Sequence, residues 1–343
     1  MELSRIRKNN CFIIAEIGVN HGGSVTLAMQ MIDEAKQCGA DAVKFQTFKA
    51  STLVEKNTPK VGYQMSTTDP GESHFDMLKA LEFNYEDHKP VIDYCRAKEI
   101  EFISTPYDIE SATFLDQLGV QVFKTASADI VDLPLHKFLA STRKDVIVST
   151  GMATLGEIEE VLSIYQTEDI TKVSLLHCVA NYPCEYKSLN LNVLKTLREA
   201  FDVRVGFSDH AIGAVPAVAS VALGAQIIEK HFTLDKNMEG PDHKASSTPE
   251  EFSALVSAIR IAEECLGSKL KLVQSEEIQM RKISRKSLFL TRNIAHGNVI
   301  KEGDLTLQRP GTGIYANMIP VIVGRMANKD LTKGEILRYG DFK

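Results

Sequence analysis

VRVGFSDHAIGAVPAVASVALGAQIIEKHF, residues 203–232, is the stretch that decides the fold. Two apolar runs typical of strands flank a small-residue segment typical of a helix, and the runs end near His210 and His231. Parallel strands joined by a helix point the same way, so their carboxyl ends meet at one rim. The pattern therefore predicts that His210 and His231 lie side by side.

Two histidines among carboxylates are a plausible site for a divalent metal ion. The alternative is that each histidine only satisfies the backbone of a loop. Their pairing on adjacent strand ends favours the metal site. Three carboxylates are expected nearby: Asp209, Glu229 and Asp242.

Working outward, similar apolar runs rich in Ile, Val and Phe alternate with helical segments along most of the chain. This alternation is typical of a parallel sheet covered by helices. Eight such units predict an α/β fold of the (β/α)8 TIM-barrel type, with an open doubly wound sheet as the alternative. The runs are 11–18, 41–47, 100–106, 120–127, 145–151, 172–178, 203–210 and 225–232.

Helix-start signals occur at Ser24, at Thr154 with Glu157, and at Thr248-Pro249. The last of these predicts a helix from Pro249 to about Leu266 that closes the barrel. We therefore expect a catalytic barrel over residues 1–266, a linker over 267–284 and a small β-rich module over 285–343. A long insertion, residues 51–82, is expected at the rim that carries active sites in barrels.

Composition limits the class of protein. The chain has 343 residues, 44% of them hydrophobic and 24% charged, as in soluble globular proteins. A formal net charge of −6 argues against a nucleic-acid surface. No apolar run is long enough for a membrane span, and Arg5, Lys8 and Asn9 precede an apolar stretch too short for a signal peptide. The scattered cysteines indicate reduced thiols and a cytoplasmic protein: Cys11, Cys38, Cys95, Cys178, Cys184 and Cys265.

Polar side chains end nearly every predicted strand, where a barrel interior is normally apolar. Lys44 and Lys124 would be costly to bury without anionic partners. Ordinary ion pairs with Glu16 or Asp129 are one explanation. A cradle for a phosphate and a carboxylate is the other, and it would include Ser127, Ser149 and Ser208. A lysine could instead form a Schiff base with a carbonyl substrate, as in an aldolase, although such enzymes need no metal.

Several motifs resemble the sialic acid synthase family, in order and over almost the whole chain. They are IIAEIGVNHGG (13–23), AVKFQTFKA (42–50), FISTPYD (102–108), VSTGMATLGEIEE (148–160), VGFSDH (205–210), IIEKHFTLDKNMEGPDHKAS (227–246) and RPGTGI (309–314). The resemblance implies condensation of phosphoenolpyruvate with N-acetylmannosamine and water. The product would be a nine-carbon sialic acid plus phosphate. It also implies a C-terminal antifreeze-like (SAF) domain.

The resemblance further assigns roles to single residues. Mn²⁺ or Mg²⁺ would be held by His210 and His231, and Glu16 would be the acid–base group. Phosphoenolpyruvate would be bound by Lys44, Lys124, Ser127, Ser149, Tyr182 and Ser208. The sugar would be bound by Gln46, Asp242 and Arg309. Arg309 would come from the partner subunit of a homodimer with swapped C-terminal domains.

The exact sugar stays open at this point. The main alternative substrate is 2,4-diacetamido-2,4,6-trideoxymannose, which would give N,N'-diacetyllegionaminate. A phosphorylated mannosamine would need a further basic cluster, which the sequence lacks. A non-enzymatic glycan-binding protein is disfavoured by the polar strand ends. The chain departs from the family pattern at Ala128-Asp129 and at Ala180, next to Asn181, and these changes bear on fine substrate contacts.

Overall fold

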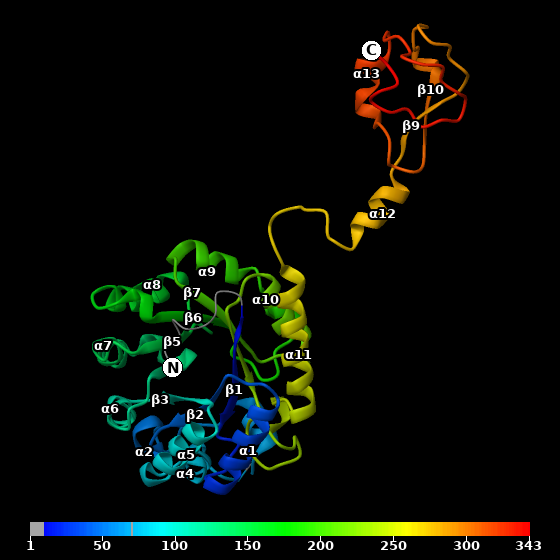
Figure 1. The fold of residues 1–343 in the computed structure, drawn as a ribbon. Coiled ribbons are helices and arrows are strands. Elements are labelled where there is room, and N and C mark those ends of the chain that lie inside the picture. The colour runs from blue at the N-terminus through cyan, green and yellow to red at the C-terminus, as the bar shows by residue number, and fades with distance from the viewer. Residues whose placement is uncertain (1–9, 70) are drawn as a thin grey trace. The chain divides into compact units, whose positions relative to one another are not determined.

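A closed barrel of eight parallel strands in chain order forms within residues 10–69 and 71–343, which the computed structural model describes (Figure 1). This confirms the predicted TIM-barrel class. The signal-peptide expectation concerns residues 1–9, which lie outside the described residues. The strands are β1 (Phe12–Gly18), β2 (Ala42–Thr47), β3 (Glu101–Pro106), β4 (Val122–Thr125), β5 (Asp145–Ser149), β6 (Val173–Cys178), β7 (Arg204–Asp209) and β8 (Ile227–His231).

Helices follow the strands and cover the outside of the barrel. The capping signals are confirmed: the Ser24 side chain accepts from Leu27 N, and Thr154 and Thr248 each form a capping box with a glutamate three residues on. No described helix combines the length and apolar character needed to cross a bilayer. The main helices are α1 (Val25–Gln37), α5 (Tyr85–Ala97), α6 (Ile109–Gln117), α7 (Leu133–Ser141), α8 (Leu155–Gln166), α9 (Val193–Phe201), α10 (Val215–Ala222) and α11 (Pro249–Leu266).

The insertion after β2 forms three short helices, α2 (Ala50–Leu53), α3 (Gly62–Thr67) and α4 (His74–Leu81). In Figure 1, α2 and α4 lie together beside β2, close to α5. The insertion thus adds a wall next to the second strand instead of leaving a free loop.

The barrel interior is layered, and the layering follows from the two-residue period of strands. One level is a closed apolar layer. β7 contributes Gly206 at this level, and there is no room for a larger residue. A Cβ at this position would lie 2.4 Å from the Ile227 carbonyl oxygen and 2.6 Å from the Leu176 side chain. The next inward residue on most strands is polar, so the polar level lies directly above the apolar one. The apolar layer consists of Phe12, Ile14, Ala42, Ile103, Val122, Ile147, Leu176 and Ile227.

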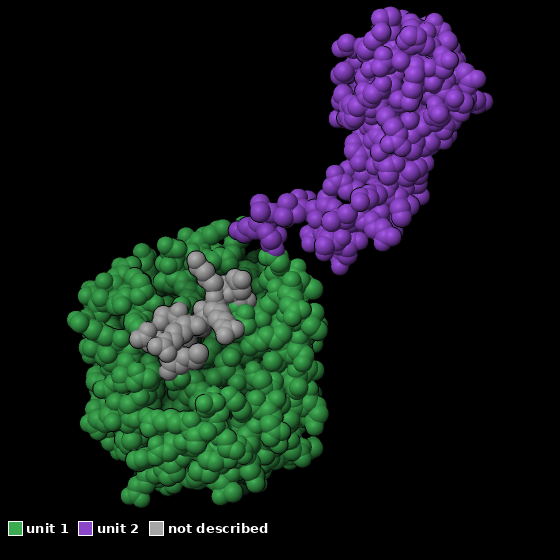
Figure 2. Space-filling model, in the orientation of Figure 1, with its two compact units in different colours: residues 1–267 green, residues 268–343 purple. Residues whose placement is uncertain are grey.

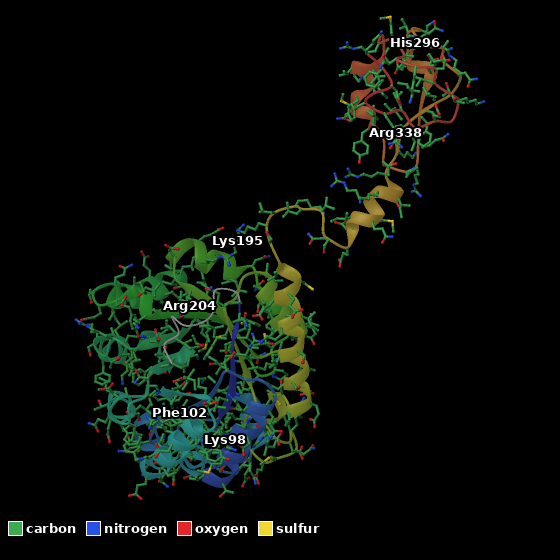
Figure 3. All side chains as sticks on the ribbon, in the orientation of Figure 1. Lys98, Phe102, Lys195, Arg204, His296 and Arg338 are labelled. Carbon is green, nitrogen blue, oxygen red and sulfur yellow. The ribbon has the colours of Figure 1, made fainter. Side chains whose placement is uncertain are left out.

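The chain divides into two compact units, Met1–Gly267 and Ser268–Lys343, coloured separately in Figure 2. The second unit begins with a connector that contains α12 (Glu277–Ser284). It continues with an antiparallel pair, β9 (Ser287–Leu290) and β10 (Leu305–Gln308), and the short helix α13 (Ile319–Ile322). Its own small apolar core includes Leu288, Ile300 and Leu337, and polar side chains such as His296 and Arg338 are exposed (Figure 3).

Candidate active site

A cavity of about 660 Å³ opens at the carboxyl ends of the barrel strands. Arg204 and Phe102, labelled in Figure 3, lie near the opposite, amino ends of β7 and β3. Arg309 directly follows β10 and belongs to the second unit, Ser268–Lys343. The other predicted site residues line the cavity: Glu16, Lys44, Gln46, Lys124, Ser127, Ser149, Tyr182, Ser208, His210, His231 and Asp242.

Two buried lysines share a buried carboxylate at the base of the cavity. Glu229 Oε1 lies 3.5 Å from Lys124 Nζ, and its Oε2 lies 3.8 Å from Lys44 Nζ. The Ser208 hydroxyl donates to Glu229 Oε1 at 2.7 Å. Burial favours the neutral acid, but the two ammonium groups outweigh it and lower the pKa of Glu229. Glu229 is therefore ionised and balances the positive charge.

The two lysines differ in protonation energetics. Burial lowers the pKa of Lys124, and Glu229 only partly opposes this. For Lys44 burial acts the same way, but Glu16 and Glu229 outweigh it, so the pKa of Lys44 is raised. The predicted pair of Lys44 with Glu16 is present at 2.8 Å. Lys124 instead pairs with Glu229, while Asp129 accepts from Ala126 N.

The Glu16 carboxyl group has a raised pKa and a fixed orientation. Its pKa is raised because it is buried and because Glu229 lies nearby, although Lys44 opposes both effects. Gln46 Nε2 donates to Glu16 Oε1 at 3.2 Å and fixes its orientation. A carboxyl group that is held in place and titrates above its ordinary range suits proton transfer near neutral pH.

His210 and His231 do lie side by side, with ring centroids 5.7 Å apart. Burial lowers the pKa of His210 to about 4 and that of His231 well below its ordinary value, so both imidazoles are neutral at pH 7. His210 Nδ1 lies 2.8 Å from the Val179 carbonyl oxygen. If Nδ1–H donates there, Nε2 is left with a lone pair. The Tyr182 ring packs against His210 with a centroid distance of 4.2 Å and an interplanar angle of 33°.

This pair fits a divalent metal ion. His231 Nδ1 is buried and has no hydrogen-bond partner among the described residues. A buried nitrogen normally has a partner, so this one is suited to bind a ligand. Within the same residues, no cluster of three or more His, Cys, Asp or Glu side chains could hold an ion. Two neutral imidazoles would therefore leave the remaining coordination positions to water or substrate, as a catalytic site requires.

Small polar groups surround the lysines. Ser149 is buried at the end of β5, and Ser127 Oγ accepts from Gly151 N at 3.1 Å. A Cβ at position 151 would lie 2.7 Å from Ser127 Oγ and 2.8 Å from Cys178 Sγ, so this close approach needs glycine. Ser127 and Ser149 line the same cavity as the two lysines.

One expectation was wrong. Asp209 does not face the histidines, because it alternates with Ser208 and His210 along β7 and points out of the barrel. There it forms a buried ion pair with Lys230 at 2.9 Å, and its Oδ1 accepts from Ala211 N. Asp242 does line the cavity, and burial raises its pKa to about 6 against the effect of Lys44.

Some cavity residues were not assigned a role from the sequence. Glu229 was expected near the histidines, and it lines the cavity with them. Its contacts with both lysines depend on side chains that meet across the barrel, which the sequence does not show. Thr105, whose hydroxyl accepts from Lys44 Nζ at 3.2 Å, is inward by the two-residue alternation along its strand. The cavity-facing residues of the insertion had no periodic signal.

The chain is similar over most of its length to known proteins. Residues 31–271 match the model of the NeuB family, and residues 285–343 match that of the SAF domain. The chain is 44% identical to the N,N'-diacetyllegionaminic acid synthase of Legionella pneumophila, over 96% of this chain and 94% of that protein. It is 42% identical to the Campylobacter jejuni protein of the same name, over 95% and 98%. A solved N-acetylneuraminic acid synthetase from Leptospira borgpetersenii superposes with a TM-score of 0.72 at 33% identity, covering 79% of this chain and 90% of that one.

Proposed function

The chain belongs to the NeuB family, and from this we propose that it is an N,N'-diacetyllegionaminate synthase. It would condense phosphoenolpyruvate with 2,4-diacetamido-2,4,6-trideoxymannose and water, and release phosphate. Two relatives at 42% and 44% identity carry that name, so the comparisons favour this sugar over N-acetylmannosamine, the first expectation from the sequence. N-acetylneuraminate synthesis becomes the second candidate.

The pairing of Lys44 and Lys124 around one carboxylate carries the proposal. Phosphoenolpyruvate bears a phosphate and a carboxylate, and two ammonium groups at the base of a concave site can hold both. Ser127 and Ser149 add hydroxyl groups beside the lysines, while Ser208 donates to Glu229. Held there, the methylene carbon of the enol would face the sugar aldehyde, which replaces a bimolecular encounter by a positioned one.

Glu16 is the proposed proton-transfer group. As the new carbon–carbon bond forms, the aldehyde oxygen gains a proton. Water then adds to the second carbon of the former enolpyruvate and loses a proton, and the carbon–oxygen bond to phosphate breaks. Glu16 can give up and take back a proton because its pKa is raised toward neutrality. A divalent ion bound by His210 and His231 would supply Lewis acidity toward the aldehyde.

The second unit is proposed to complete the site from a partner subunit. Residues 285–343 match the SAF domain, and Arg309 is the residue that the family resemblance assigns to the sugar's acetamido group. The proposal is a homodimer in the cytoplasm in which Arg309 reaches the partner's cavity.

The deciding experiment is a phosphate-release assay with phosphoenolpyruvate and each of three sugars: the diacetamido-trideoxy sugar, N-acetylmannosamine and N-acetylmannosamine 6-phosphate. We expect release with the first sugar, and loss of release after exhaustive chelation with recovery on adding Mn²⁺ or Mg²⁺. Full activity after chelation would contradict the metal-dependent scheme.

The lowered pKa of Lys124 favours one other chemistry, because a neutral amine can attack a carbonyl group. A Schiff-base pyruvate aldolase would trap pyruvate on Lys124 when borohydride is added. We expect no such adduct, and its detection would replace the synthase scheme.

A further inference from the structure

The cavity has two chemically different sides. The strand ends contribute charged and hydroxyl groups, including Lys44, Lys124 and Glu229. The insertion contributes mainly apolar side chains, and among its polar ones is His74. We call this insertion side the apolar wall: Leu53, Val54, Val61, Met77, Leu78 and Leu81.

The insertion is anchored and forms a defined surface. Lys60 is 8% exposed, and its ammonium group donates to Thr68 Oγ1 at 3.0 Å and lies 3.3 Å from Glu72 Oε1. Thr67 Oγ1 donates to the Pro241 carbonyl oxygen at 3.3 Å, so α3 contacts the segment that carries Asp242. The Lys60 contacts hold the insertion together, and the Thr67 contact links it to the segment beside the strand ends.

One ring nitrogen of His74 has no hydrogen-bond partner among the described residues. This nitrogen, Nδ1, is buried, although the residue lines the cavity. Burial, aided by the charge of Lys60, lowers the pKa of His74, so the ring is neutral at pH 7. A neutral imidazole nitrogen donates or accepts according to its tautomer. An amide group of a ligand offers both a donor and an acceptor and satisfies either form.

The position of the second substrate follows from the first. If phosphoenolpyruvate occupies the lysine side, the sugar must extend toward the insertion. Hydroxyl groups that meet the apolar wall would lose water without gaining a partner, whereas a methyl group would lose nothing. His74 offers a polar group to one amide of the sugar.

We propose that the apolar wall and His74 select a sugar with a methyl group at its terminal carbon and an acetamido group near it, against sugars with hydroxyl groups there. This rests on the proposed function and assigns its specificity to residues outside the barrel strands. A hydrophobic pocket discriminates against an added hydroxyl group by about 10- to 100-fold. The wild-type preference for the diacetamido-trideoxy sugar over N-acetylmannosamine should be of that order.

The test measures kcat/KM for both sugars, and the preference is their quotient. Leu78→Gln should reduce the preference about tenfold. His74→Leu should lower kcat/KM for the diacetamido sugar about fivefold, which corresponds to one hydrogen bond, and His74→Asn should restore part of it. Met65→Gln is the matched control: Met65 lies on the same insertion, is 51% exposed and does not line the cavity. The KM for phosphoenolpyruvate should stay within about twofold in all variants, because one lost contact on the sugar side leaves the lysine side intact.

The outcomes separate the two proposals. If the wild-type enzyme turns over only N-acetylmannosamine, the proposed function is wrong and the selection with it. If it prefers the diacetamido sugar and the variants keep that preference, only the assignment to the apolar wall and His74 is overturned. Partial unfolding of a variant lowers both rates together and leaves the preference unchanged, so the quotient still decides.

Discussion

Replacing Glu229 by Gln removes the carboxylate charge that faces both lysines of the cavity. In the wild-type enzyme the carboxylate lies 3.5 Å from Lys124 Nζ and 3.8 Å from Lys44 Nζ. Lys44 keeps Glu16 at 2.8 Å in the variant, whereas Lys124 loses its nearest opposite charge. The change therefore leaves a buried ammonium group poorly compensated.

These distances set the expected loss in the free energy of unfolding of the Glu229→Gln variant. Each contact is worth about 4 kcal/mol at an effective dielectric constant of about 20, but the variant also no longer buries a charged carboxylate. Breaking a buried ion pair by removing one partner costs about 3–5 kcal/mol. Because the Gln amide can keep the hydrogen bond from Ser208, we expect about 3 kcal/mol, the lower end of that range. The thermal midpoint should fall by roughly 5 °C, because a barrel unit of this size has a large unfolding entropy.

The pH dependence provides a second readout. Burial already lowers the pKa of Lys124 in the folded protein, and loss of Glu229 should lower it further. When the pKa of a lysine is lower in the folded protein than in the unfolded chain, the buried ammonium group destabilises the folded protein. This destabilisation is complete at pH values below the pKa of the folded protein. This penalty disappears as the pH rises toward the unfolded value of about 10.4. The stability difference from wild type should therefore shrink between pH 7 and pH 10.

Urea unfolding at pH 7 and pH 10 measures both effects. Inorganic phosphate should stabilise the variant more than the wild type, because an added anion replaces the missing charge. Glu185→Gln is the control, since its ion pair with Lys187 is at the surface and should contribute no more than about 1 kcal/mol. A Glu229→Gln protein as stable as wild type at pH 7, or a deficit that does not change with pH, would refute this account of the cavity charges.

Three further predictions concern turnover. His231→Ala should abolish metal-dependent phosphate release while circular dichroism stays unchanged, and Mn²⁺ binding followed by electron paramagnetic resonance should weaken in parallel. Arg309→Ala should raise the sugar KM far more than the phosphoenolpyruvate KM; mixed dimers of Arg309→Ala and His231→Ala chains should recover activity, and no recovery would exclude the swapped dimer. Because burial raises the pKa of Asp242 to about 6, the sugar KM should rise as the pH falls below 6 and the carboxylate is protonated, and Asp242→Asn should remove that dependence.

The sequence was sufficient for the barrel because two local signals agreed. Continuous apolar runs marked the strands, and capping residues such as Ser24 and Thr248 marked the helix starts. Lys44 and Gln46 are two residues apart on β2, and both line the cavity, as the two-residue period of a strand requires. These are properties of short segments, which elementary strand and helix geometry determines.

The remaining features depend on three-dimensional packing. Asp209 was misplaced because its neighbours in sequence suggested the site, whereas the strand period turns it toward Lys230. The pairing of Glu229 with Lys124 joins strands that are not neighbours in the barrel, and it depends on side chains meeting across the interior. The inward residues of the insertion come from short helices whose orientation is set by contacts such as that of Thr67 with Pro241.

The closed apolar layer below the cavity has an evolutionary consequence. It holds the strands together with residues such as Ile14 and Ile227, none of which needs to meet a substrate. Mutations in the insertion can therefore alter the wall of the cavity without disturbing this layer. Under the proposed function, descendants of one ancestral enzyme could acquire new sugar preferences through changes in a few helical turns, while the residues at the strand ends stayed the same.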